Sequence, residues 1–179
     1  KSHLDVKVRR QGQSMTFESI QADFTYQSTK IALCAVYLPR KPAGDAFFEE
    51  FSQLIDSYAL TTVRPILVGD FNLHIDKPES LPERKFLGIL NDSGFKQHVS
   101  VPTHVKGHTL DLAITRSDDP IVHSVEIQYP GHSDHFAVVC SLTLVKPTAP
   151  SHRWIMARKL KQVDQDRLKQ DIQDSALLT

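Results

Sequence analysis

The chain has 179 residues, which is enough for one domain with a hydrophobic core. Hydrophobic residues make up 40% and charged residues 23%, as in ordinary globular proteins. Basic and acidic residues number 21 each, and this neutral balance excludes blanket electrostatic binding of nucleic acid while leaving room for a local basic groove.

Apolar periodicity and turn residues predict a series of strands along the chain. We expect these strands at residues 4–8, 15–22, 31–37, 66–68, 110–115, 122–127 and 136–144. The segments 31–37 and 66–68 are apolar throughout, which is typical of strands that are buried on both faces. Each of these two strands therefore needs a covering layer on both sides.

Helices are predicted in two places between the strands. Asp45 is expected to cap the first helix, whose apolar side chains fall on one broad face: Phe47, Phe48, Phe51, Leu54 and Ile55. Pro82 is expected to open the second helix and Gly94 to close it. Strands mixed with helices without strict alternation predict an α/β (α+β) fold, a layered β-sandwich flanked by helices.

The composition changes near residue 146, and we predict a boundary there. Residues 1–145 would form the domain, and residues 146–179 a basic linker and helix. Pro147 and Pro150 indicate the linker, and Asp164 is expected to cap a last helix with Leu168 and Ile172 spaced four residues apart. The alternative for this segment is a solvated linker helix without a role.

The first candidate site follows the buried strand 66–68. The sequence Gly69-Asp70-Phe71-Asn72 places a carboxylate and a carboxamide two residues apart at the end of that strand. A carboxylate can take a proton from water or hold a cation, and a neutral amide can donate hydrogen bonds to an anion. This pair suits hydrolysis of a phosphate ester. The alternative is an Asx-rich turn that only closes the strand.

A second candidate pair is Asp111 and His135. Asp111 lies between two leucines in a strand, where a carboxylate needs a partner, and a histidine would be held by it in a fixed tautomer. His135 ends the sequence Ser133-Asp134-His135 at a junction between loop and strand. The alternative is that Asp111 only ties down a loop. A zinc site is less favoured, because no cysteine cluster accompanies His98, His104, His108 and His132.

These segments occur in an order that resembles a known family. Residues 36–39 (Val-Tyr-Leu-Pro), 69–72 (Gly-Asp-Phe-Asn), 109–112 (Thr-Leu-Asp-Leu) and 133–135 (Ser-Asp-His) resemble the endonuclease/exonuclease/phosphatase superfamily. The match is closer to its apurinic/apyrimidinic-type branch, carried by non-LTR (LINE-type) retrotransposons. The resemblance covers roughly residues 17–144 and implies a DNase-like fold.

The resemblance implies a role for each matching residue. Asp70 would orient or deprotonate the attacking water. Asn72 would hydrogen-bond the scissile phosphate and Tyr37 would contact it, while Asp111 would orient His135. His135 would stabilise charge developing on the phosphate. Asp134 would lie on the metal side, with Mg²⁺ or Mn²⁺ as the cofactor. The remaining matched positions would lie near the DNA: Thr103 and Ser133.

The resemblance also implies partners and a location. The parent protein would nick target DNA, and the free 3′ hydroxyl would prime reverse transcription. A reverse transcriptase domain would follow in the same polyprotein. No apolar segment reaches membrane-spanning length and no signal peptide is visible, so we expect no membrane association and a location in the nucleus or cytoplasm.

One family feature has no counterpart here. The family carries a metal-binding Glu, and an Asn, on strands well before the tyrosine motif, whereas Glu18 stands in a different context. We therefore expect a domain that is incomplete on its amino-terminal side and inactive as an isolated fragment. Two alternatives remain open: a phosphomonoesterase of the same superfamily, and a non-catalytic remnant that serves as a binding or structural module.

Overall fold

A computed structural model describes residues 6–26, 29–39, 43–144 and 164–174 of the chain. The chain divides into two compact units, Lys1–Thr148 and Ala149–Thr179. The first unit contains the two sheets and the two helices that pack on them, so it carries every predicted site residue.

The first unit is built around a mixed sheet of six strands in the order β1-β2-β3-β4-β6-β5. Strands β3 and β4 are parallel, and all other neighbours are antiparallel. The crossover between β3 and β4 contains a helix, as parallel neighbours require. The strands are β1 (Val6–Gln13), β2 (Glu18–Tyr26), β3 (Thr29–Tyr37), β4 (Arg64–Asp70), β5 (Phe95–Gln97) and β6 (Asp111–Arg116).

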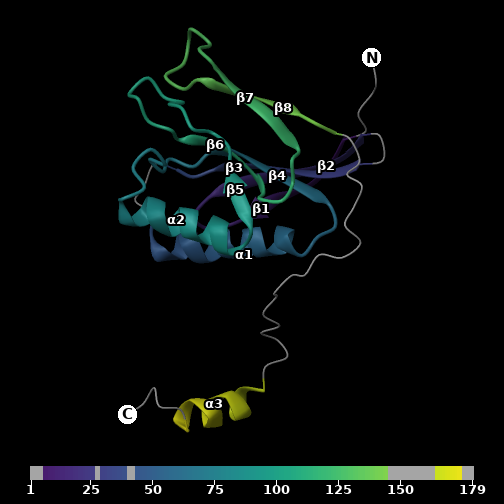
Figure 1. Ribbon diagram of the computed structural model, residues 1–179, viewed down its shortest axis with the longest axis vertical. Coiled ribbons are helices and arrows are strands. Elements are labelled where there is room, and N and C mark those ends of the chain that lie inside the picture. Colours follow the sequence, from purple (N-terminus) through teal and green to yellow (C-terminus); the bar gives the residue numbers. More distant parts are fainter. Residues whose placement is uncertain (1–5, 27–28, 40–42, 145–163, 175–179) are drawn as a thin grey trace. The chain divides into compact units, whose positions relative to one another are not determined.

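Helices α1 (Asp45–Ala59) and α2 (Leu81–Asp92) cover one face of this sheet (Figure 1). Their shared core is rich in aromatic rings that are almost fully buried: Phe47, Phe51, Phe71 and Phe86. The predicted apolar face of α1 is confirmed, but its predicted cap is wrong. Gly44 is the N-cap residue, because Asp45 is already helical and its carboxylate instead accepts a hydrogen bond from Lys85 of α2 at 2.6 Å.

A second sheet of two strands, β7 (Val122–Gln128) and β8 (Ala137–Leu142), covers part of the other face (Figure 1). A small second core lies between the sheets and is centred on Ile31, Ile66 and Ile121. The layered sandwich predicted from the sequence is therefore confirmed. Farther along this face, Ile20 of β2 is 54% exposed.

The carboxyl end of α1 is fixed by an arginine from a distant strand. Arg116 at the end of β6 is buried, and its guanidinium donates to the carbonyl oxygens of Tyr58 at 2.6 Å and Val63 at 3.0 Å. The last carbonyls of a helix lack partners within the helix, and this arginine supplies one to Tyr58 from outside, beside the amide of Thr61 at 3.2 Å.

The second unit contains helix α3 (Gln165–Gln173). Asp164 caps it as predicted, because its carboxylate accepts hydrogen bonds from the amides of Asp166 at 3.0 Å and Arg167 at 3.1 Å. The predicted linker falls at residues 146–163, outside the described residues. In the part of the chain that the structure describes, no helix is long and apolar enough to cross a membrane.

Candidate active site

The ends of three neighbouring strands bring Tyr37, Asp70 and Asp111 into one row. Tyr37 pairs with Asp70 across β3 and β4, and Asp70 pairs with Asp111 across β4 and β6. Residues paired in register on adjacent strands point to the same face of a sheet. The three side chains therefore lie at one edge of the sheet, on the face that is opposite the helices.

Gly69 allows β3 and β4 to approach closely just before Asp70. Its φ angle is +143°, and a Cβ atom at this position would lie 1.8 Å from the carbonyl oxygen of Val36. No other residue fits this combination of backbone angle and contact. The glycine of Gly-Asp-Phe-Asn is therefore needed to place Asp70 at the sheet edge.

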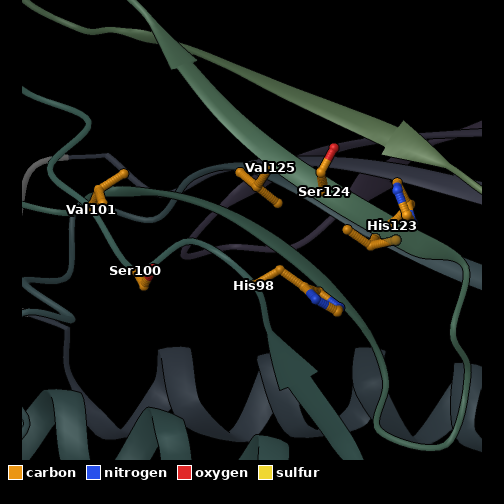
Figure 2. A pocket seen from close by; sticks show the side chains of 7 residues that line it. His98, Ser100, Val101, His123, Ser124 and Val125 are labelled. Carbon is orange, nitrogen blue, oxygen red and sulfur yellow. The ribbon is translucent and has the colours of Figure 1, made fainter.

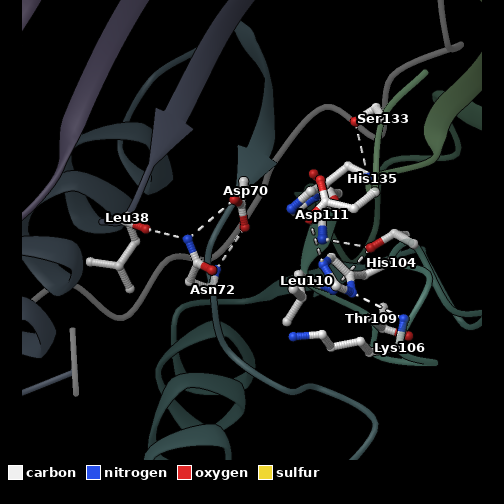
Figure 3. A network of polar contacts seen from close by, with 12 residues as sticks. Leu38, Asp70, Asn72, His104, Lys106, Thr109, Leu110, Asp111, Ser133 and His135 are labelled. Carbon is white, nitrogen blue, oxygen red and sulfur yellow. Dashed lines mark hydrogen bonds and ion pairs between the residues drawn. The ribbon is translucent and has the colours of Figure 1, made fainter. Parts of the chain in front are cut away.

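Asn72 is fixed in a left-handed conformation, with φ of 47°. Its backbone N–H donates to Oδ1 of Asp70 at 2.9 Å, which makes the Asx turn considered from the sequence. Its side-chain Nδ2 donates to the carbonyl oxygen of Leu38 at 2.7 Å and to Oδ2 of Asp70 at 3.1 Å (Figure 3). The turn and the candidate site are thus the same structure, and Asn72 holds the Asp70 carboxylate in place.

Asp111 and His135 form the predicted pair. Nδ1 of His135 lies 2.9 Å from Oδ2 of Asp111, and both side chains are partly buried (Figure 3). Burial lowers the pKa of His135, but the hydrogen bond and charge of Asp111, together with the charges of Asp70 and Asp134, outweigh it. The pKa of His135 is raised overall, so the site favours the imidazolium form.

Thr103 and Ser133 shape the loops around this pair. Thr103 is fully buried, and its hydroxyl oxygen accepts hydrogen bonds from the amides of Leu110 and Asp111, both at 3.0 Å. The hydroxyl oxygen of Ser133 accepts a hydrogen bond from the amide of His135 at 3.0 Å. Both side chains thus fix the backbone of a dyad residue, and their proposed contact with DNA stays a prediction.

Sequence reasoning did not select His104 as a site residue. His104 is 2% exposed, its Nε2 lies 3.3 Å from Oδ2 of Asp134, and its ring stands edge-on to that of His135 at 4.9 Å. The sequence feature that could have indicated His104 is its position directly after Thr103, which was already a predicted site residue.

Two overlapping groups of side chains have ligand atoms close enough to hold a cation. One consists of Asp70, Asp111 and His135, and the other of His104, Asp134 and His135. Their carboxylate oxygens are hard donors of the kind that Mg²⁺ and Mn²⁺ prefer. The carboxylates of these groups, from Asp70, Asp111 and Asp134, therefore fit a divalent cation.

A sequence comparison identifies the family of the chain. A family model described as endonuclease-reverse transcriptase matches residues 31–139, which is more than half of the chain. The chain belongs to the endonuclease-reverse transcriptase family. A search of curated proteins gave no match.

Solved structures share the fold of this endonuclease-reverse transcriptase family member. The endonuclease domain of TRAS1, a telomere-specific non-LTR retrotransposon, is 19% identical with a TM-score of 0.60. The match covers 80% of this chain and 69% of that endonuclease domain. An endonuclease/exonuclease/phosphatase family protein from Leptotrichia buccalis is 13% identical with a TM-score of 0.54, covering 70% of this chain and 53% of that one. The 3′ phosphatase NExo from Neisseria is 15% identical with a TM-score of 0.53, and the match covers 78% of this chain and 70% of NExo.

Glu18 lies on the same row as the family motif residues, although the sequence placed it in a different context. It is the first residue of β2 and pairs with Tyr37. Neighbouring strands are about 4.8 Å apart, so two strand spacings separate Glu18 from Asp70, on the order of 10 Å. Among the described residues, Glu18 belongs to neither group of side chains whose ligand atoms lie close together.

A separate cavity of about 240 Å³ lies away from this row. Figure 2 shows its lining side chains, which come from the segment after β5 and from β7 and include His98 and His123. Nε2 of His98 is 2.7 Å from the hydroxyl of Thr115, and burial, with a smaller contribution from Lys96, lowers its pKa. Of the four histidines that raised the zinc alternative, only His104 belongs to a possible metal group among the described residues.

Proposed function

We propose that this chain carries the catalytic residues of a DNA-nicking endonuclease of a non-LTR retrotransposon. The observation that supports it is the row of Tyr37, Asp70 and Asp111 with His135 bound to Asp111. This arrangement combines a carboxylate that can accept a proton with a cationic group that can face a phosphate. The family match and the TRAS1-like fold agree with this assignment.

The reaction is hydrolysis of one phosphodiester bond. Water attacks phosphorus and Asp70 accepts its proton, while the bond between phosphorus and the 3′ oxygen breaks. The 3′ oxygen takes a proton from solvent, which leaves a 3′ hydroxyl and a 5′ phosphate. Asn72 keeps the Asp70 carboxylate oriented through its hydrogen bonds. Tyr37 is 47% exposed at the end of β3 and would contact the substrate phosphate.

The pair of Asp111 and His135 acts on the charge that develops at phosphorus. Asp111 holds Nδ1 of His135, which leaves the opposite ring nitrogen to donate a hydrogen bond toward the phosphate. The raised pKa of His135 keeps that nitrogen protonated over a wider pH range. Asp134 would hold Mg²⁺ or Mn²⁺, and when bound the ion supplies positive charge that stabilises the leaving oxygen.

The wider context is part of the same proposal. The target DNA and a following reverse transcriptase domain would be the partners, residues 146–179 would lead toward that domain, and the protein would act in the nucleus or cytoplasm. The metal-binding Glu of the family would come from sequence outside these residues.

The test is the conversion of supercoiled plasmid to the nicked form in Mg²⁺ by a version of the chain extended upstream to supply the metal-binding Glu, because residues 1–179 alone are expected to nick weakly or not at all. The nick is then extended by a DNA polymerase. Extension requires a 3′ hydroxyl, so it separates this chemistry from other cleavage. His135→Ala and Asp70→Asn should slow nicking by roughly 100-fold or more. His123→Ala, at an exposed histidine on β7, serves as the matched control. Release of phosphate from a 3′-phosphorylated oligonucleotide without nicking would favour the phosphomonoesterase. No activity in either assay, from the chain or from its extended version, would favour the non-catalytic module.

A further inference from the structure

The loop that carries His104 is fixed against the loop that carries Asp134. The amide of Val105 donates to the carbonyl of Asp134 at 2.9 Å, and the amide of Phe136 donates to the carbonyl of Thr103 at 2.7 Å. These bonds flank a β-bridge between His104 and His135. These backbone contacts therefore hold the segment that carries His104 next to the segment that carries Asp134.

One ring nitrogen of His104 has a defined role. Nδ1 accepts a hydrogen bond from the backbone N–H of Lys106 at 3.1 Å. A backbone amide can only donate, so Nδ1 must be unprotonated and the neutral ring carries its proton on Nε2. Nε2 is the atom that lies 3.3 Å from Oδ2 of Asp134. His104 therefore donates a hydrogen bond to Asp134.

This tautomer decides what His104 can do. A nitrogen that carries a proton has no lone pair for a metal, so His104 is not a ligand even though it lies near two other candidate ligands. Asp134, in contrast, has a side chain that is 66% exposed and few constraints from packing. Two contacts act on this carboxylate: the backbone N–H of Asp134 itself and the N–H of His104, which is the contact that comes from another segment.

We propose that His104 is a positioning residue that holds Asp134 toward the catalytic centre, and that it excludes soft metals such as Zn²⁺ from this group. Its importance for nicking rests on the proposed function. The tautomer of His104 and its effect on Asp134 do not, and they can be measured in the protein without metal or DNA.

The first measurement uses the whole chain with ¹⁵N-labelled histidine in long-range ¹H–¹⁵N correlation spectra. His104 should show a protonated Nε2 and an unprotonated Nδ1, and its pattern should stay the same when ZnCl₂ is added. A proton on Nδ1, or loss of the Nε2 proton with Zn²⁺, would overturn the proposal. This result needs no variant, so it holds even if a substitution prevents folding.

The second measurement is the orientation of Asp134, from its Hα–Hβ scalar couplings. His104→Gln retains an N–H donor and should preserve the single rotamer of the wild type, whereas His104→Phe removes the donor and should give averaged couplings. Unchanged couplings in His104→Phe would refute the positioning role. Binding of Mn²⁺ should weaken roughly 10- to 100-fold in His104→Phe, the range typical for loss of such an outer contact, and by less in His104→Gln.

The two proposals fail in different ways. Averaged Asp134 couplings in His104→Phe together with no nicking by any version would retain the positioning role and reject the endonuclease. Unchanged nicking in His104→Phe together with unchanged Asp134 couplings would retain the endonuclease and reject the positioning role.

Discussion

Nδ1 of His135 lies 2.9 Å from Oδ2 of Asp111, and the two residues are 24 positions apart in the sequence. This contact joins the segment before β8 to the first residue of β6. It links the two sheets of the sandwich at the edge where Asp70 also lies. A displacement of one sheet relative to the other would therefore change the contact between His135 and Asp111 at the candidate site.

Asp111→Asn should lower the pKa of His135. The hydrogen bond and negative charge of Asp111 are the largest effects that favour the imidazolium, and without them only the smaller effects of Asp70 and Asp134 oppose burial. The measurement is an NMR titration of His135. Asp92→Asn, an exposed carboxylate at the end of α2, is the control and should leave this pKa unchanged. An unaltered titration in Asp111→Asn would show that the pair is not coupled.

Gly69→Ala should destabilise the protein by at least about 3 kcal/mol, because the new Cβ would meet the carbonyl of Val36 in a backbone conformation that alanine avoids. Gly88→Ala is the matched control, since Gly88 lies inside α2 and a Cβ there meets nothing within 4 Å. That change should stabilise by roughly 0.5–1 kcal/mol. Urea unfolding measures both, and equal effects of the two substitutions would contradict the close approach of β3 and β4.

The contribution of His98 to the free energy of unfolding should fall as pH drops below about 6.5, the ordinary pKa of histidine. Burial lowers the pKa of His98 in the folded protein, so the unfolded chain binds a proton over a range where the folded chain does not. His98→Gln should reduce this loss, and His132→Gln, at an exposed position, should not. Denaturant unfolding at pH 5 and pH 8 gives the comparison. A pH dependence that is the same in His98→Gln would exclude His98 as its source.

Residues 1–179 alone should nick plasmid weakly or not at all, whereas a version extended upstream to include the metal-binding Glu should nick it in Mg²⁺. In the extended version, His135→Ala should cost roughly 100- to 1,000-fold in rate, the order expected for one charge-stabilising donor. Removal of Mg²⁺ with EDTA should stop the reaction. Rapid Mg²⁺-dependent nicking by residues 1–179 would show that these residues supply a complete ligand set.

Periodicity predicted most of the fold because the elements with strong patterns are also the most buried ones. The apolar segments became β3 and β4, and the phenylalanine pattern became the buried face of α1. Strand β5 was missed, because three residues are too few for a pattern to repeat. The cap of α1 was mispredicted because the competing partner, Lys85, is 40 positions away in the sequence.

The site was predicted where a motif coincided with a strand end. Asp70 and Asp111 could be placed at an edge because each begins or ends an apolar segment. His104 could not be selected in the same way, because its role depends on the Lys106 amide and on a carboxylate 30 positions later. Contacts of this kind are set by loop conformation, which carries no periodic signal.

The contact between Arg116 and the end of α1 has a consequence during synthesis. Arg116 follows Tyr58 by 58 positions, so at about 5–20 residues per second the ribosome adds it on the order of 3–12 s after the helix is complete. Until then the last carbonyls of α1 lack this partner. The helix can form early, but the hydrogen bond from Arg116 to its carboxyl end can form only when β6 joins the sheet. A nascent chain that stalls before residue 116 cannot make this bond.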